Sequence, residues 1–204
     1  MNYLHKGDLP ENLKFPSVVA IDTETMGLNF SRDKLCLVQI SFGDKNAHLV
    51  QVGGALGYGA KNLKKLLKNK NIIKIFHYAR FDVAMLKKYL GVLCNSIYCT
   101  KIASKLARTY TDRHGLKELC KELLNVEISK QQQSSDWGNS ELSKNQINYA
   151  ANDVLYLHEI KEKLDNILER ENRVQLAKAL FKFIPTRVTL DLLGWQNSDI
   201  FSHT

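Results

Sequence analysis

SVVAIDTE (Ser17–Glu24), LCLVQISF (Leu35–Phe42) and AHLVQV (Ala47–Val52) are three consecutive stretches rich in β-branched or aromatic residues. Each is short and is bounded by Gly, Asn or Asp, which is typical of β-strands. Residues 18–21 of the first stretch form a nearly continuous apolar run, as in a strand that is buried on both faces. We therefore predict a central β-sheet that contains these three strands.

The rest of the chain alternates between strand and helix patterns and then becomes mostly helical. Leucines at 63–67 have helical spacing, and Ile72–Phe76 is predicted to be a further strand. A helix is also predicted over Gly115–Leu124. The segment 143–146 fits a capping box that opens a long helix running through Leu157. This order of elements predicts an α/β fold, with helices packed on a sheet.

Length and composition favour one globular domain. The chain has 204 residues, of which 44% are hydrophobic and 25% are charged. We expect a single domain over 1–204, with a core at about 17–183 and a tail at 185–204 that packs on the core or on another subunit. The net charge of +8 suits a polyanionic partner, although a lysine-rich solvated surface has the same charge.

The sequence indicates no membrane span, export signal, disulfide or cysteine zinc site. No apolar run approaches the roughly 20 residues of a membrane span, and the first residues resemble neither a secretory signal nor a transit peptide. We therefore expect a soluble cytoplasmic protein. The four cysteines form no CxxC pair, which favours buried reduced thiols over a zinc site or disulfides.

Asp22-Thr23-Glu24 ends the first predicted strand and is the first candidate site. Residues i and i+2 of a strand point to one face, so Asp22 and Glu24 project together while Thr23 points away. Two acids at the end of a buried strand need compensation, and hard carboxylate oxygens suit Mg²⁺ or Mn²⁺. Taken alone, this tripeptide is explained better by two surface acids at a strand end.

Two further acids lie in weaker patterns. Asp82 follows an apolar strand and opens an apolar helix, where an Asp in the first turn also suits the helix dipole. Tyr149 and Asp153 are four residues apart on the predicted late helix and therefore share a face. Beside a metal ion, Asp153 can ligate while the Tyr149 phenol orients the attacking water. His77 is more often a packed histidine than a ligand.

In this order and setting, the three motifs resemble those of the DEDDy 3′–5′ exonucleases of the ribonuclease D superfamily, which have an RNase H-like (DnaQ-like) core. Further stretches extend the likeness to the short bacterial nanoRNase C family. They are GDLP (7–10), TKIASKL (100–106), YTDRHGL (110–116), SKQQQSSDW (129–137) and LDLLGW (190–195). The resemblance covers essentially the whole chain.

The resemblance implies a mixed sheet flanked by helices and a two-metal active site. Asp22, Glu24, Asp82 and Asp153 would hold two divalent ions, Mg²⁺ or Mn²⁺, and Tyr149 would orient the attacking water. The implied reaction is hydrolysis of a phosphodiester from the 3′ end, which releases nucleoside 5′-monophosphates. The ions would flank the scissile phosphate.

The resemblance also implies the substrate and the assembly. Family members degrade very short RNA, especially dinucleotides, with DNA as a further possibility, and they form homo-oligomeric rings such as an octamer. A hydrophobic residue at the Leu28 position wedges between the terminal bases in this superfamily, although an ordinary loop leucine touching the core is the alternative. We include Met26 and His77 with Leu28 as expected substrate-binding residues.

Two other functions remain open. One is a ribonuclease D-like enzyme that trims longer RNA or single-stranded DNA, and the other is a catalytically silent nucleic-acid-binding scaffold. The complete set of motif acids argues against the scaffold, and the absence of added helical domains after Phe183 argues against the trimming enzyme. Lys61–Lys74 contains six lysines and no acid, so it is either a solvated helix face or a phosphate-attracting patch.

Overall fold

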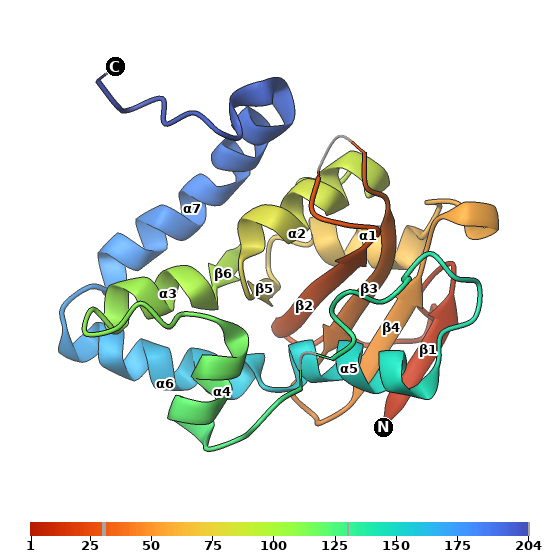
Figure 1. Cartoon of the computed structure of the whole chain (residues 1–204), viewed down its shortest axis with the longest axis horizontal. Helices are drawn as coiled ribbons and strands as arrows, with labels where there is room; N and C mark the ends of the chain where they lie inside the picture. Colours follow the sequence, from red (N-terminus) through yellow and green to blue (C-terminus); the bar gives the residue numbers. More distant parts are fainter. Residues whose placement is uncertain (30–31, 130, 204) are drawn as a thin grey trace.

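The computed structural model describes residues 1–29, 32–129 and 131–203, so Lys130 and Thr204, which fall within the resemblance stretch and the tail discussed above, lie outside it. Six strands form one sheet in the order β1-β4-β3-β2-β5-β6 (Figure 1). Their bounds are β1 (Asn2–Lys6), β2 (Val18–Thr25), β3 (Leu35–Ser41), β4 (Ala47–Gln51), β5 (Ile73–Phe76) and β6 (Ile97–Cys99). The three strands predicted at the start of the chain therefore form the middle of the sheet.

The sheet is mixed. β2, β3 and β4 form an antiparallel meander, whereas β1 pairs in parallel with β4, and β5 pairs in parallel with β2 and β6. The central strand β3 is buried along its whole length, in keeping with its continuous apolar sequence. The predicted α/β class with a mixed sheet is confirmed.

Helices pack on this sheet and on one another. Their bounds are α1 (Lys61–Lys68), α2 (Ala79–Met85), α3 (Thr100–Ala107), α4 (Leu116–Leu124), α5 (Lys144–Leu155), α6 (Leu157–Arg170) and α7 (Val174–Leu190). α5 lies across β2, β3 and β4, while α6 packs against α3 and α4. α1 lies behind the sheet in Figure 1 and buries Leu63, Leu66 and Leu67, the three leucines whose spacing predicted it.

The long helix predicted to run from the capping box through Leu157 is wrong in one respect. Ser143 and Gln146 do form the capping box, but the helix ends at Leu155 and a new helix begins at Leu157. The backbone of Tyr156 between them departs from the regular α-helical values, with φ −100° and ψ −7°. Because α5 packs on the strands and α6 packs on α3, the chain has to change direction between the two helices.

The two ends of the chain extend the fold beyond residues 17–183. β1 forms an edge of the sheet, and Leu9 after it is buried. At the other end α7 continues through Pro185 to Leu190, followed by a π-helical turn at Asp191–Trp195. Arg80 of α2 forms a bidentate ion pair with the buried Asp191, at 2.6 and 2.8 Å, which ties this turn to the core.

Two simpler expectations concern thiols and membranes. All four cysteines are buried and free, as their sequence contexts predicted. Within the described ranges, no helix is both long enough and apolar enough to cross a bilayer.

Candidate active site

The acids of the DTE motif lie at the carboxyl-terminal end of β2. Asp22 and Glu24 project together toward α5, which presents Asp153 to them. Carboxylate oxygens of these three residues lie within 4.8 Å of one another. The alternation of β2 therefore brings two acids together, and the packing of α5 across the sheet adds the third.

Asp82 approaches the same place from α2. Its carboxylate is buried, and its Oδ1 accepts a hydrogen bond from Thr23 Oγ1 at 2.7 Å. Thr23 does point away from the neighbouring Asp22 and Glu24, as strand alternation predicts, but its hydroxyl contacts the acid of another motif. β2 thus contributes to the site from both of its faces.

A cavity of about 620 Å³ opens over these carboxylates. All eight residues proposed for the site from sequence line it, namely Asp22, Glu24, Met26, Leu28, His77, Asp82, Tyr149 and Asp153. Residues 115–117 at the start of α4 and 133–135 of the loop before α5 form further walls. Motifs separated by more than a hundred residues therefore surround a single cavity.

Burial, with mutual repulsion as the lesser cause, raises the pKa values of the acids. Burial raises the pKa values of Asp22 and Glu24 well above their usual range, and the neighbouring carboxylates raise them further. Burial likewise raises the pKa of Asp82 to about 7, although the Thr23 hydrogen bond opposes this shift. Four carboxylates in one cavity cannot all be ionised at neutral pH without compensating positive charge.

This donor set fits hard divalent cations. Carboxylate oxygens are the ligands that Mg²⁺ and Mn²⁺ prefer, and the site offers no thiolate or imidazole among the three residues that converge most closely. Asp22, Glu24 and Asp153 are placed to share one ion, and Asp82 lines the same cavity. Positive charge at this point would restore the ionised form of all four acids.

Tyr149 lies one helical turn before Asp153 on α5. Burial, followed by the charge of Asp153, raises the pKa of its phenol, which therefore stays protonated near neutral pH. The ring lies 6.1 Å, centroid to centroid, from that of the buried Trp137. A protonated hydroxyl in the cavity beside the acids is suited to orient a water molecule.

The residues proposed for substrate contact divide into exposed and packed groups. Leu28 is 81% exposed and Met26 is 52% exposed, so neither side chain is buried in the core, and their contact with substrate stays a prediction. His77 is half-buried, and its Nδ1 lies 2.9 Å from Thr100 Oγ1. It is therefore a packed, hydrogen-bonded histidine that also lines the cavity.

Sequence reasoning missed the aromatic and cationic wall of the cavity. Tyr78 has a left-handed backbone (φ 72°) and is 45% exposed, and the Nζ of Lys101 lies 4.6 Å from its ring centroid. Lys101 and Lys117 both line the cavity. Because Tyr78 lies directly after a strand and Lys101 is on α3, only the tertiary structure shows that they meet here.

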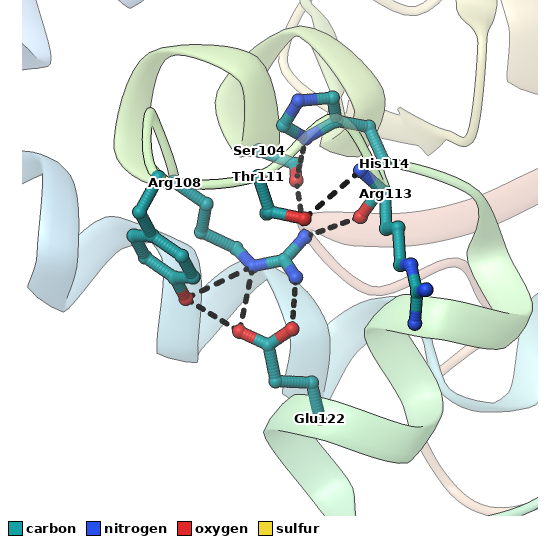
Figure 2. Close-up of polar contacts among 7 residues, drawn as sticks. Ser104, Arg108, Thr111, Arg113, His114 and Glu122 are labelled. Carbon is teal, nitrogen blue, oxygen red and sulfur yellow. Dashed lines mark hydrogen bonds and ion pairs between the residues drawn. The ribbon is translucent and has the colours of Figure 1, made fainter.

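A buried arginine holds the loop that leads into the cavity wall. Arg108 has no exposed surface and donates to Ser104 Oγ (3.0 Å), to the carbonyl of Arg113 (2.8 Å) and to the carboxylate of Glu122 (Figure 2). The ring of His114 contacts the same Ser104 hydroxyl at 2.9 Å. These bonds fix the turn that immediately precedes residues 115–117 at the cavity.

Comparison with known proteins agrees with this geometry. Residues 7–169 match the 3′–5′ exonuclease family. Because the match covers most of the chain, including every acid of the site, the chain belongs to this family.

Among individual proteins, the chain is similar to NrnC of Brucella melitensis, with 56% identity and a TM-score of 0.94 over 99% of this chain and 98% of the other. That protein is also known bound to pGG and with bound Mg²⁺. RNase D of Escherichia coli is 25% identical, with a TM-score of 0.75 over 84% of this chain and 45% of that one. The resemblance to ribonuclease D and nanoRNase C is therefore confirmed.

Curated relatives are longer than this chain. Ribonuclease D of Gluconacetobacter diazotrophicus is 33% identical over 164 residues, which are 80% of this chain and 41% of the relative. The chain thus spans about two fifths of that protein's length.

Proposed function

We propose that this protein is a metal-dependent 3′–5′ exoribonuclease that hydrolyses very short oligonucleotides, especially dinucleotides, to nucleoside 5′-monophosphates. The observation that carries the proposal is the convergence of Asp22, Glu24 and Asp153 within 4.8 Å, with Asp82 in the same cavity. The similarity to a protein known bound to pGG supports the short substrate.

Each group of site residues has a distinct part in this proposal. The four acids hold two divalent ions, which when bound neutralise phosphate charge and supply an activated water. Tyr149 orients that water through its protonated hydroxyl. Lys101 and Lys117 offer positive charge to the phosphates of the substrate, while Tyr78 and Leu28 offer apolar surface to its bases.

The extent of the cavity favours substrates of few nucleotides. The exposed Leu28 and the half-exposed Tyr78 lie in the same cavity as the acids, so contacts to the bases are local to the scissile bond. A nucleotide beyond this cavity would gain little from these residues. We therefore expect binding energy to come from the terminal nucleotides at the 3′ end.

The test is a timed product analysis on 5′-labelled RNAs of two to ten nucleotides, with Mg²⁺ or with EDTA. We expect kcat/KM for dinucleotides to equal or exceed that for ten-mers and EDTA to abolish turnover. A steady rise of kcat/KM with length would instead support the trimming exonuclease. Binding without turnover in Mg²⁺ and in Mn²⁺ would support the silent scaffold.

We also propose that the protein forms a homo-oligomer, with an octameric ring as the specific form. After the turn at Asp191–Trp195, the end of the chain projects away from the body of the molecule (Figure 1). Leu193 is 67% exposed and Phe201 is 78% exposed, and Trp195 and Ile200 are also exposed. Several large apolar side chains on one projecting segment are suited to contact a second copy.

A further inference from the structure

A second cavity, of about 690 Å³, lies beside the catalytic one and shares a wall with it. Met26 lines both cavities, and the buried Trp137 lines the second. Met26 packs closely over Gly138, where an added Cβ would lie 2.5 Å from the methionine sulfur. The acids line only the first cavity, so the second is a separate binding space among the described residues.

Two residues that line this second cavity each carry a buried polar atom that has no hydrogen-bond partner among the described residues. These atoms are Gln51 Oε1 and Trp137 Nε1, in side chains belonging to residues that are 5% and 2% exposed. The Gln51 amide is held in place because its Nε2 donates to the carbonyl of Asn139 at 2.8 Å. A buried polar atom without a partner costs roughly 1–3 kcal/mol, so the cavity is suited to a ligand that supplies one donor and one acceptor.

The remaining walls favour a planar ring with an attached anion. Apolar side chains, including Leu35, Val52 and Leu56, line the cavity together with the ring of Tyr58. Lys6, Arg32 and Lys34 stand at its edge. Lys6 is paired with the exposed Glu141 and Arg32 with Asp33, whereas no ion pair is found for Lys34 among the described residues. An apolar cavity with few polar groups and a cationic rim has the properties of a small-molecule site.

We propose that this cavity binds a nucleoside 5′-monophosphate, with the base inside and the phosphate at the cationic rim. The Watson–Crick or Hoogsteen edge of a nucleobase presents both donors and acceptors, which are the kinds of group that Gln51 Oε1 and Trp137 Nε1 lack as partners. The phosphate matches the rim lysines and arginine. The choice of monophosphate rests on the proposed function, because that reaction releases this class of molecule. Its binding would reach the catalytic cavity through the shared Met26.

The test uses the full chain in EDTA and follows Trp137 fluorescence after Trp195→Phe, since the chain has two tryptophans. GMP is the probe, and guanosine and inorganic phosphate are titrated separately. We expect GMP to change the fluorescence saturably, Gln51→Met to weaken its binding at least fivefold, and Lys34→Gln to weaken GMP but not guanosine. Gln39→Met is the matched control, because Gln39 is a fully buried glutamine that lines neither cavity and whose amide has no partner within the described part of the chain.

Three outcomes would overturn the proposal. The first is no saturable fluorescence change up to 10 mM GMP. The second is equal GMP affinity in Gln51→Met, Lys34→Gln and the Gln39→Met control. The third is that Leu28→Ser loses GMP binding while Gln51→Met keeps it. The last result would place the nucleotide in the catalytic cavity only. Dinucleotide hydrolysis by the same proteins, measured separately with Mg²⁺ in place of EDTA, reports on the proposed function independently. GMP binding without such hydrolysis would overturn only the proposed function.

Discussion

Thr23 Oγ1 donates a hydrogen bond of 2.7 Å to Asp82 Oδ1, joining the middle residue of the DTE motif to an acid 59 positions later. The residue between two acids of the candidate site thus positions a third. A hydrogen bond to a charged group contributes about 1.5–3 kcal/mol, and Asp82 needs this one because its carboxylate is buried. The bond therefore bears directly on how Asp82 faces the cavity.

Replacing Thr23 tests this positioning role. Thr23→Val keeps the shape of the side chain but removes the donor, so we expect kcat to fall about tenfold and the Mg²⁺ concentration for half-maximal activity to rise. Thr23→Ser retains the hydroxyl and should restore most of both properties. Measuring initial rates across a Mg²⁺ series checks the prediction, and an unchanged Mg²⁺ requirement in Thr23→Val would contradict it.

The buried acids predict an unusual pH dependence of stability in the metal-free protein. The pKa of Asp82 is about 7 in the folded chain and lies near 3.8 when unfolded, so the folded state binds the extra proton between these values. Unfolding free energy therefore falls as pH rises from about 4 through 7. Asp22 and Glu24, whose pKa values are also raised by burial, add to this loss.

Asp82→Asn should remove the contribution of Asp82 to this pH-dependent fall in unfolding free energy. The amide oxygen of the new side chain can still accept the hydrogen bond from Thr23. In EDTA at pH 8 we expect the variant to melt several degrees above the unmodified protein, and at pH 5 the difference should be less than half as large. Saturating Mg²⁺ should reverse the order at pH 8, because the ion stabilises only the complete set of acids. Calorimetry at both pH values measures this, and equal melting temperatures in EDTA at pH 8 would refute it.

Tyr149→Phe tests the water-orienting hydroxyl. Packing of the ring is retained, so we expect kcat to fall by about 10²–10⁴ while KM changes little. Tyr156→Phe is the matched control, since that tyrosine lies between α5 and α6 and does not line the catalytic cavity. If kcat is the same in both variants, Tyr149 serves only to pack α5.

The exposed aromatic side chains of the projecting tail are predicted to hold copies of the protein together in an oligomer. Trp195→Ser together with Phe201→Ser removes two exposed aromatic side chains without touching the buried Asp191, so the monomer fold should persist. We expect multi-angle light scattering at micromolar concentration to show smaller species than for the unmodified protein. Leu176→Ser, at an exposed position of α7, is the control and should leave the assembly unchanged. A monomeric unmodified protein would rule out the oligomer.

Local sequence patterns were enough to predict the central elements of the fold. The alternation and composition of β2, β3 and β4 are properties of short stretches, and so is the capping box at Ser143 and Gln146. β1 was missed because it is a short, half-exposed strand whose partner, β4, lies more than forty residues away. The break at Tyr156 was missed because apolar spacing continues across it.

The candidate site likewise has features that the sequence predicted and features that only the tertiary structure decided. Strand alternation determined that Asp22 and Glu24 share a face, and helical spacing determined that Tyr149 and Asp153 do. The tertiary structure decided that Asp153 meets Asp22 and Glu24 within 4.8 Å. It also decided that Tyr149, Asp82 and Lys101 line the same cavity. The physical reason is that periodicity fixes directions within one element, whereas the distance between two elements depends on how the helices pack across the sheet.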